Sequence, residues 1–175
     1  YVISTAERIS NINISASGGT IGNIYAAGIG GDVAVEGGSK NEINPERITL
    51  PEDFGSLTGT AKITISGNAV VTGNIYASGQ GFQNTTYDTS KNAYLNGTVQ
   101  INIEGGTINQ NVFGGGKGID EAGYEDCARI AEGSTVKIQM TGGPVKGNIY
   151  GGGEIAKVYG STSVTVAGKT AEEVT

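Results

Sequence analysis

Apolar and polar residues alternate in five short segments of the chain, and this alternation is its clearest local pattern. The segments are 12–14, 63–65, 101–103, 138–140 and 164–166. Such alternation is typical of β-strands that bury one face. No stretch of useful length has a helical period, and the glycine density opposes helix formation. The pattern therefore predicts an all-β protein.

A second motif, Gly-Asn-Ile-Tyr, starts nine or ten residues after the start of four of these strands. It is complete at 22–25, 73–76 and 147–150, and a diverged copy, Gln-Asn-Val-Phe, occupies 110–113. Successive copies start 51, 37 and 37 residues apart. Self-similarity at a period of tens of residues is typical of repeats that stack on one another.

Glycine turns punctuate each repeat. A Gly-Gly or Gly-Asn pair separates every strand from its motif, and a further glycine-containing turn follows the motif. Glycine adopts positive φ without steric cost, so these pairs mark bends. A repeat that consists of strand, turn, strand, turn and a variable segment predicts a right-handed parallel β-helix (β-solenoid) of about four to five coils. The right-handedness follows from the general bias of parallel crossovers.

Stacked coils would lie about 4.8 Å apart and would place equivalent side chains in ladders. The expected interior ladders are Ile12–Ile63–Ile101–Ile138, Ile14–Ile65–Ile103–Met140 and Ile24–Ile75–Val112–Ile149. The expected outer ladders are the stacked aromatic residues Tyr25, Tyr76, Phe113 and Tyr150, and the amides Asn23, Asn74, Asn111 and Asn148. Because Phe113 lacks a hydroxyl, the aromatic ladder is interpreted as packing rather than as a sugar-binding stripe. The amides are interpreted as stabilising turns, because asparagine bonds neighbouring backbone groups.

The variable segments form insertions near 30–59, 81–97 and 117–133 within a single β-solenoid domain that spans 1–175. They fall at the same point of every repeat. Insertions at one point must emerge on one side of a stack, and this side is often the binding side.

Charge and composition exclude some classes of partner. The chain carries a net charge of −6 and has a pI of about 4.6. No basic patch is present that would bind nucleic acid or an anionic membrane. No apolar run approaches the roughly 18 residues of a membrane span. Both ends look cut from a longer chain, so we expect a fragment of a larger surface protein whose partners include neighbouring repeats of the same chain.

The chemistry of most enzymes is missing. The chain has no histidine, which removes Ser-His-Asp and Cys-His catalysis and imidazole-based zinc sites. Its single cysteine, Cys127, follows Glu125 and Asp126, and neighbouring negative charges disfavour a reactive thiolate. We therefore expect a protein that is not an enzyme and that needs no cofactor and no metal.

Acidic loop residues leave one alternative open, a carbohydrate-active β-helix enzyme such as a polysaccharide lyase or hydrolase. Glycosidases need two carboxyl groups about 5–10 Å apart. The candidates are Asp88, Asp120, Glu121, Glu125, Asp126 and Glu154. If this alternative holds, several of them should converge beside a groove that also holds a lysine or arginine. Solvated loop carboxylates are the simpler interpretation.

The insertions also carry tyrosines next to polar residues. The candidate ligand-binding residues are Tyr87, Asp88, Tyr94, Tyr124 and Asp126. Exposed tyrosines can stack on sugars or anchor a protein partner. They can equally fold back to cover the sheet, and the sequence does not decide between these two arrangements.

The last complete repeat carries a resemblance to known proteins. The segment 136–153, Val-Lys-Ile-Gln-Met-Thr-Gly-Gly followed by Gly-Asn-Ile-Tyr-Gly-Gly-Gly, resembles the glycine-rich "GNVYGGG" β-helix repeats of bacterial adhesin-like cell-surface proteins. The resemblance covers most of the chain outside the insertions. It implies secretion, an extracellular location on the cell surface, and a structural or adhesive role in binding host or bacterial glycans or proteins. It implies no catalytic residues.

Overall fold

The structure is a computed structural model that describes residues 11–28, 55–83 and 92–167 of the 175-residue chain. Regular structure in these residues consists of β-strands alone, and neighbouring strands in each sheet are parallel. The strands are β1 (Asn11–Ala16), β2 (Thr20–Ile21), β3 (Ile24–Tyr25), β4 (Leu57–Ile65), β5 (Val70–Val71), β6 (Ile75–Tyr76), β7 (Leu95–Glu104), β8 (Thr107–Ile108), β9 (Val112–Phe113), β10 (Thr135–Gly142), β11 (Ile149–Tyr150) and β12 (Ser161–Val166). The all-β prediction is confirmed, and each of the five alternating segments lies in one long strand of the same sheet.

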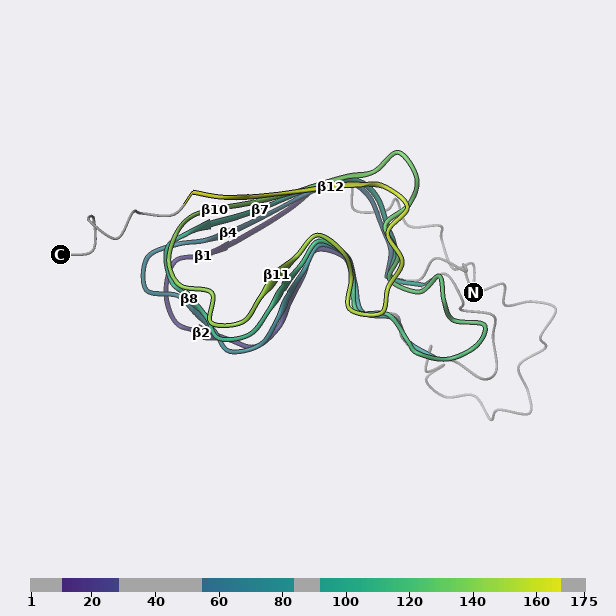
Figure 1. Cartoon of the computed structure of the whole chain (residues 1–175), viewed down its shortest axis with the longest axis horizontal. Helices are drawn as coiled ribbons and strands as arrows, with labels where there is room; N and C mark the ends of the chain where they lie inside the picture. The colour runs from purple at the N-terminus through teal and green to yellow at the C-terminus, as the bar shows by residue number, and fades with distance from the viewer. Residues whose placement is uncertain (1–10, 29–54, 84–91, 168–175) are drawn as a thin grey trace, which may run out of the picture.

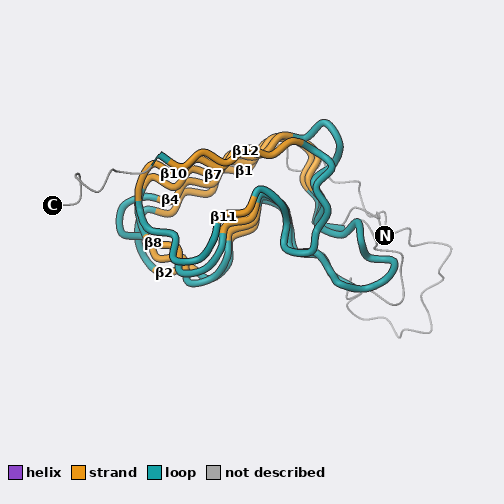
Figure 2. Tube along the Cα trace, in the orientation of Figure 1, coloured by secondary structure: helices purple, strands orange, loops and turns teal. Residues whose placement is uncertain are grey.

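The strands form three parallel sheets that run along a stack of repeats. Their orders are β1-β4-β7-β10-β12, β11-β9-β6-β3 and β2-β5-β8. Seen along the stack, successive repeats overlie one another: the long sheet forms the upper layer, the β3–β11 sheet lies beneath it, and β2 and β8 lie at the lower left (Figures 1 and 2). This arrangement is compatible with a parallel β-helix.

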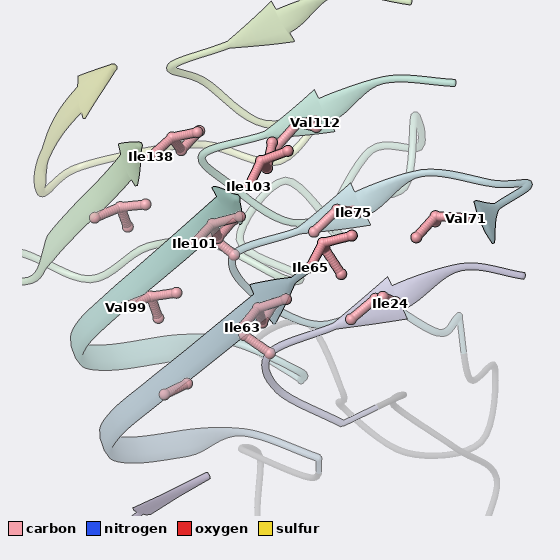
Figure 3. Packing of buried hydrophobic residues seen from close by; sticks show 14 of the residues in the cluster. Ile24, Ile63, Ile65, Val71, Ile75, Val99, Ile101, Ile103, Val112 and Ile138 are labelled. Carbon is pink, nitrogen blue, oxygen red and sulfur yellow. The ribbon is translucent and has the colours of Figure 1, made fainter. Parts of the chain in front are cut away.

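The core lies between the long sheet and the two smaller sheets. Isoleucine and valine side chains from β4, β7 and β10 point toward those from β3, β5, β6 and β9 (Figure 3). Most of them are completely buried, including Ile63, Ile101, Val112 and Ile75. Burial of each such side chain contributes about 1.5–3 kcal/mol, so these ladders hold the stack together.

The first interior ladder differs from the expected one. Ile14, not Ile12, pairs with Ile63, and Ala16 pairs with Ile65. The observed ladders are Ile14–Ile63–Ile101–Ile138–Val164 and Ala16–Ile65–Ile103–Met140–Val166. The expected equivalences were therefore wrong by two residues in the first repeat. The reason is that the β1–β2 and β2–β3 connections are each one residue shorter than the corresponding connections of the second repeat, β4–β5 and β5–β6.

The repeated motif performs the structural roles that its residues suggest. The backbone N–H of Asn74 donates to Oδ1 of Asn23 (2.7 Å), and the same bond joins Asn111 to Asn74 and Asn148 to Asn111 (2.9 Å each). The amide ladder is thus confirmed. In the turn before the motif, Gly106 has a φ of 71°, a conformation that favours glycine.

The aromatic ladder is stacked as expected, but only part of it lies outside. Successive ring centroids are 4.8, 5.2 and 5.1 Å apart. Tyr76 and Phe113 are buried, whereas Tyr150 is 43% exposed. The expectation of an outer ladder was therefore wrong for the two middle rings. The physical reason is that the chain runs toward the long sheet at the motif and turns back away from it just afterwards (Figure 1). The segment that follows the last motif includes Glu154, which contacts Tyr76.

Candidate functional site

The end of the long sheet nearest the insertions carries a second, shorter set of stacked positions. Leu95 bridges Ile130, and Ile130 bridges Val158, both in parallel. Leu95 and Ile130 are buried, and Val158 packs against the same core. Side chains alternate along an extended chain, so the residues just before these three face away from the core. These residues are Tyr94, Arg129 and Lys157.

Buried alanines in an unusual backbone conformation precede two of these side chains. Ala93 has a φ of 58° and Ala128 a φ of 55°, and both are fully buried together with Ala156, which is 7% exposed. Left-handed backbone at a residue other than glycine is uncommon and persists only where packing determines it. The alanines thus fix the direction in which Tyr94 and Arg129 leave the chain.

Asp126 joins the exposed side chains into one cluster. Its Oδ2 lies 3.1 Å from Nη1 of Arg129, and its Oδ1 lies 3.8 Å from Nζ of Lys157. The hydroxyl of Tyr159 donates to the same Oδ1 at 3.1 Å. The guanidinium of Arg129 lies over the ring of Tyr94, 5.5 Å from its centroid. We call Tyr94, Asp126, Arg129, Lys157 and Tyr159 the Asp126 patch.

The patch remains accessible and has unused hydrogen-bonding capacity. Tyr159 is 47% exposed, and the Nε of Arg129 is buried without a hydrogen-bond partner among the described residues. Beside them lies an open hollow of about 510 Å³ lined by Asn96, Arg129, Ala131, Glu132 and Tyr159. An aromatic face next to amide, guanidinium and carboxylate groups offers both stacking and hydrogen bonds to a polar ligand.

The predicted ligand-binding residues are only partly brought together. Tyr94 and Asp126 meet through Arg129. Tyr124 is half-buried in the preceding turn, where its N–H donates to the carbonyl of Glu121 and its carbonyl accepts from the N–H of Cys127. Tyr87 and Asp88 lie outside the described residues.

Three members of the patch were not predicted: Arg129, Lys157 and Tyr159. A signal for them exists in the sequence. Leu95, Ile130 and Val158 are apolar residues at the far end of each variable segment, and aligning them would have placed Arg129 and Lys157 beside Tyr94. The signal was missed because the alternation here covers only two apolar positions in each repeat, an alanine and the larger residue two positions later.

The acidic candidates for catalysis are divided between several places. Asp120, Glu121, Glu125 and Lys157 line a second open hollow of about 420 Å³. The pKa of Glu125 is lowered by hydrogen bonds from its own backbone N–H and from that of Gly123, so it is a carboxylate at neutral pH. Glu154 instead accepts a hydrogen bond from Tyr76. No group of three or more acidic or cysteine side chains within 11–28, 55–83 and 92–167 is placed to hold a metal ion.

The aromatic ladder is a second candidate site. The Tyr76 hydroxyl donates to Glu154 and accepts from Nδ2 of Asn74 (2.9 Å), and the Tyr25 hydroxyl donates to Oε1 of Gln80 (2.7 Å). Burial is the main cause that raises the pKa of both tyrosines; the next is the negative charge of Glu154 for Tyr25 and the hydrogen bond to Glu154 for Tyr76. The rings are stacked, the two middle ones are buried, and the hydroxyls of Tyr25 and Tyr76 are hydrogen-bonded, which favours a packing role for this ladder.

No family model, curated protein or solved structure matches the chain. In the part of the chain that the structure describes, no helix has the length and apolar character needed to cross a bilayer.

Proposed function

We propose that this chain is a non-catalytic, adhesive module of a secreted bacterial cell-surface protein. In this proposal the fold is a right-handed parallel β-helix of about four to five coils, with its insertions on one side. The coils form a rigid frame, and the looped side presents side chains to extracellular glycans or proteins. The glycine-rich repeat that resembles adhesin-like surface proteins supports the location and the role.

The observation that carries the proposal is the Asp126 patch. At the equivalent positions before Leu95, Ile130 and Val158 the repeats place a tyrosine, an arginine and a lysine. The arginine and the lysine pair with Asp126, and the tyrosine packs against the arginine. This cluster beside the exposed ring of Tyr159 suits recognition better than support.

A paired set of variants tests this role. The purified chain should be screened on a glycan array and against extracellular matrix and host-surface proteins. Tyr159→Ala and Arg129→Ala should lower the affinity for any captured ligand at least tenfold. Tyr150→Ala is the matched control, because Tyr150 is a similarly exposed tyrosine on β11 outside the patch. Equal loss of binding in the patch variants and in the control would refute the patch as the binding site.

A carbohydrate-active enzyme remains the second candidate, and one observation favours it. Asp120, Glu121 and Glu125 line the same hollow as Lys157, which brings carboxylates beside a basic group. Incubation with a panel of acidic and neutral polysaccharides, with and without added Ca²⁺, would detect cleavage as new reducing ends. Turnover that disappears in Glu125→Gln and Lys157→Met but persists in Tyr159→Ala would replace the adhesive proposal with an enzymatic one.

A further inference from the structure

The two outermost strands of the long sheet present complementary open edges. β1 lies at one edge and β12 at the other. The four strand pairs from β1 to β12 are all parallel, and their register is continuous apart from one irregularity after Met140. Each outer edge has no strand beside it among the described residues. An open edge presents a row of unpaired N–H and C=O groups, which is a template for another strand.

The side chains at the two edges continue the same interior ladders. On β12, Val164 and Val166 occupy the ladder positions of Ile138 and Met140 but are 40% and 56% exposed. On β1, Ile14 occupies the ladder position of Val164 and is half-buried. A strand with the sequence of β1, placed on β12 in the register of the other pairs, would set Ile14 over Val164 and Ala16 over Val166.

The amide ladder ends with a matching donor and acceptor. Each Asn side chain accepts a hydrogen bond from the backbone N–H of the next Asn, from Asn23 through Asn148. At the β11 end, Oδ1 of Asn148 therefore accepts no such bond within the described residues. At the β3 end, the N–H of Asn23 donates to no Asn in that part of the chain. Among the described residues, the β11 end of the ladder thus lacks an asparagine donor, and the β3 end lacks an asparagine acceptor.

The aromatic ladder ends in the same way. Tyr150 at the β11 end is 43% exposed, and Tyr25 closes the β3 end. The rings within the ladder are almost parallel, with interplanar angles between 3° and 13°. A ring from another copy would stack on the outer face of Tyr150 in the way that Tyr150 stacks on Phe113.

From these four continuities we infer that the β12 end of one copy of this chain binds the β1 end of a second copy, head to tail. The partner is a second copy because its β1 end would reproduce, on β12, the contact between successive repeats. The strand register, the direction of the hydrogen bonds and the stacking of the rings would all be the same. The contact joins two different surfaces and does not close on itself, so it leads to linear chains rather than to a symmetric dimer. It does not depend on the adhesive role proposed above.

Charge sets the conditions in which this association is strongest. Each copy carries a net charge of −6, so two copies repel at low ionic strength. Salt screens charges that are separated by more than about 8–10 Å at 0.1–0.15 M. The association should therefore strengthen when NaCl is raised, as expected for an apolar, hydrogen-bonded contact between like-charged bodies.

A mixing experiment with the full chain distinguishes this mode from other kinds of association. Val164→Lys combined with Val166→Lys blocks the β12 end, and Ile12→Lys blocks the β1 end. The unaltered chain should form a concentration-dependent series of oligomers in sedimentation velocity, and each blocked variant alone should remain a monomer. An equimolar mixture of the two blocked variants should yield a 1:1 dimer and nothing larger. Circular dichroism and thermal unfolding check that each variant is folded.

Cross-linking tests the register. In a Cys127→Ala background, Thr165→Cys in one copy should form a disulfide with Ser15→Cys in another, because both residues belong to the same ladder as Gln139. Ser163→Cys is the matched control. It lies two residues away on β12 and should not cross-link to Ser15→Cys, since its Cα would be beyond the roughly 7 Å limit for a disulfide.

Three results would overturn the inference. The first is a monomer at all concentrations and salt conditions, which would mean that the ends are covered by other parts of the chain. The second is a mixture of blocked variants that does not dimerise while the unaltered chain oligomerises. The third is a disulfide between two Thr165→Cys copies, which would show that β12 pairs with itself.

Discussion

The side of the molecule beneath the long sheet and the side near the insertions are built from the same repeats but follow different rules. Beneath the sheet, equivalent positions hold the same kind of residue, as in the ladder Ile14–Ile63–Ile101–Ile138. Near the insertions, equivalent positions hold Tyr94, Arg129 and Lys157. Stacking constrains buried residues because each must fill the space between two neighbours, whereas exposed residues need only be compatible with solvent.

The two sides also differ in how they are stabilised. The core side depends on large apolar residues such as Ile63, Ile65 and Ile103, which are completely buried. The small second cluster contains only Ala93, Ala128 and Ala156, and beyond it the Asp126 patch relies on partly exposed ion pairs. Exposed ion pairs contribute about 0–1 kcal/mol each. The frame can therefore remain stable when residues of the patch are substituted.

The largest expected effect comes from a charge placed in the core. Ile101→Asp puts an unpaired carboxylate at a completely buried position between Ile63 and Ile138. It should lower the free energy of unfolding by about 4 kcal/mol or more. Urea denaturation followed by circular dichroism measures the change. The control is Gln100→Glu on the outer face of the same strand, expected to change stability by about 0.5 kcal/mol or less. Similar effects of the two variants would mean that the strand does not bury one face.

Loss of a ring from the middle of the aromatic ladder should have the next largest effect. Phe113→Ala removes a ring that is 7% exposed and stacks on both Tyr76 and Tyr150. The expected loss is about 3–4 kcal/mol. Tyr150→Ala, at the exposed end of the same ladder, should cost only about 1 kcal/mol. Equal losses in equilibrium unfolding would show that the segments after the motif do not cover the middle rings.

An intermediate, pH-dependent effect is expected at Tyr76. Its pKa is raised above 10 in the folded protein, first by burial and then by the hydrogen bond to Glu154. Unfolded tyrosines ionise near pH 10, so the unfolded chain releases this proton first. The contribution of Tyr76 to stability is therefore present below about pH 10 and declines as the pH rises further.

Tyr76→Phe should remove part of that decline. Phe113 shows that the ladder accepts a phenylalanine, so the ring itself should remain in place. Unfolding by urea between pH 7 and pH 11 should give a smaller loss of stability with pH in the variant than in the unaltered chain. Identical pH profiles would contradict the link between the Tyr76–Glu154 hydrogen bond and alkaline stability.

The smallest effect on stability is expected on the side near the insertions. Asp126→Asn keeps the shape of the side chain and removes its charge, so the ion pairs with Arg129 and Lys157 are lost. The free energy of unfolding should fall by about 1 kcal/mol or less. The affinity for a ligand captured by the unaltered chain should fall much more. A loss of stability comparable to that of Phe113→Ala would show that the patch supports the fold.

Much of the frame could be predicted from the sequence because its signals are local and repeated. Alternation identified the five long strands, and the copies of Gly-Asn-Ile-Tyr identified the stacked aromatic and amide ladders. The pairing of the first repeat was not predicted correctly. Two connections there are each one residue shorter than in the second repeat. Both Ile12 and Ile14 are apolar, so the apolar pattern fits either register.

The candidate site was less predictable because its members come from separate repeats. Tyr94 and Asp126 were identified as polar or aromatic residues in insertions, but their meeting through Arg129 depends on how the repeats stack. The burial of Tyr76 likewise depends on a bend in the chain and on Glu154, which is 78 residues away.

Period-two alternation and a recurring motif act over a few residues, so β-strands, stacked repeats and the residues of the motif ladders can be predicted from the sequence. The register of the first strand, the covering of the middle aromatic rings and the meeting of side chains at Asp126 are set by packing between repeats. These features depend on the lengths of the connections and on contacts between residues of different repeats, and such contacts form only when the repeats pack together.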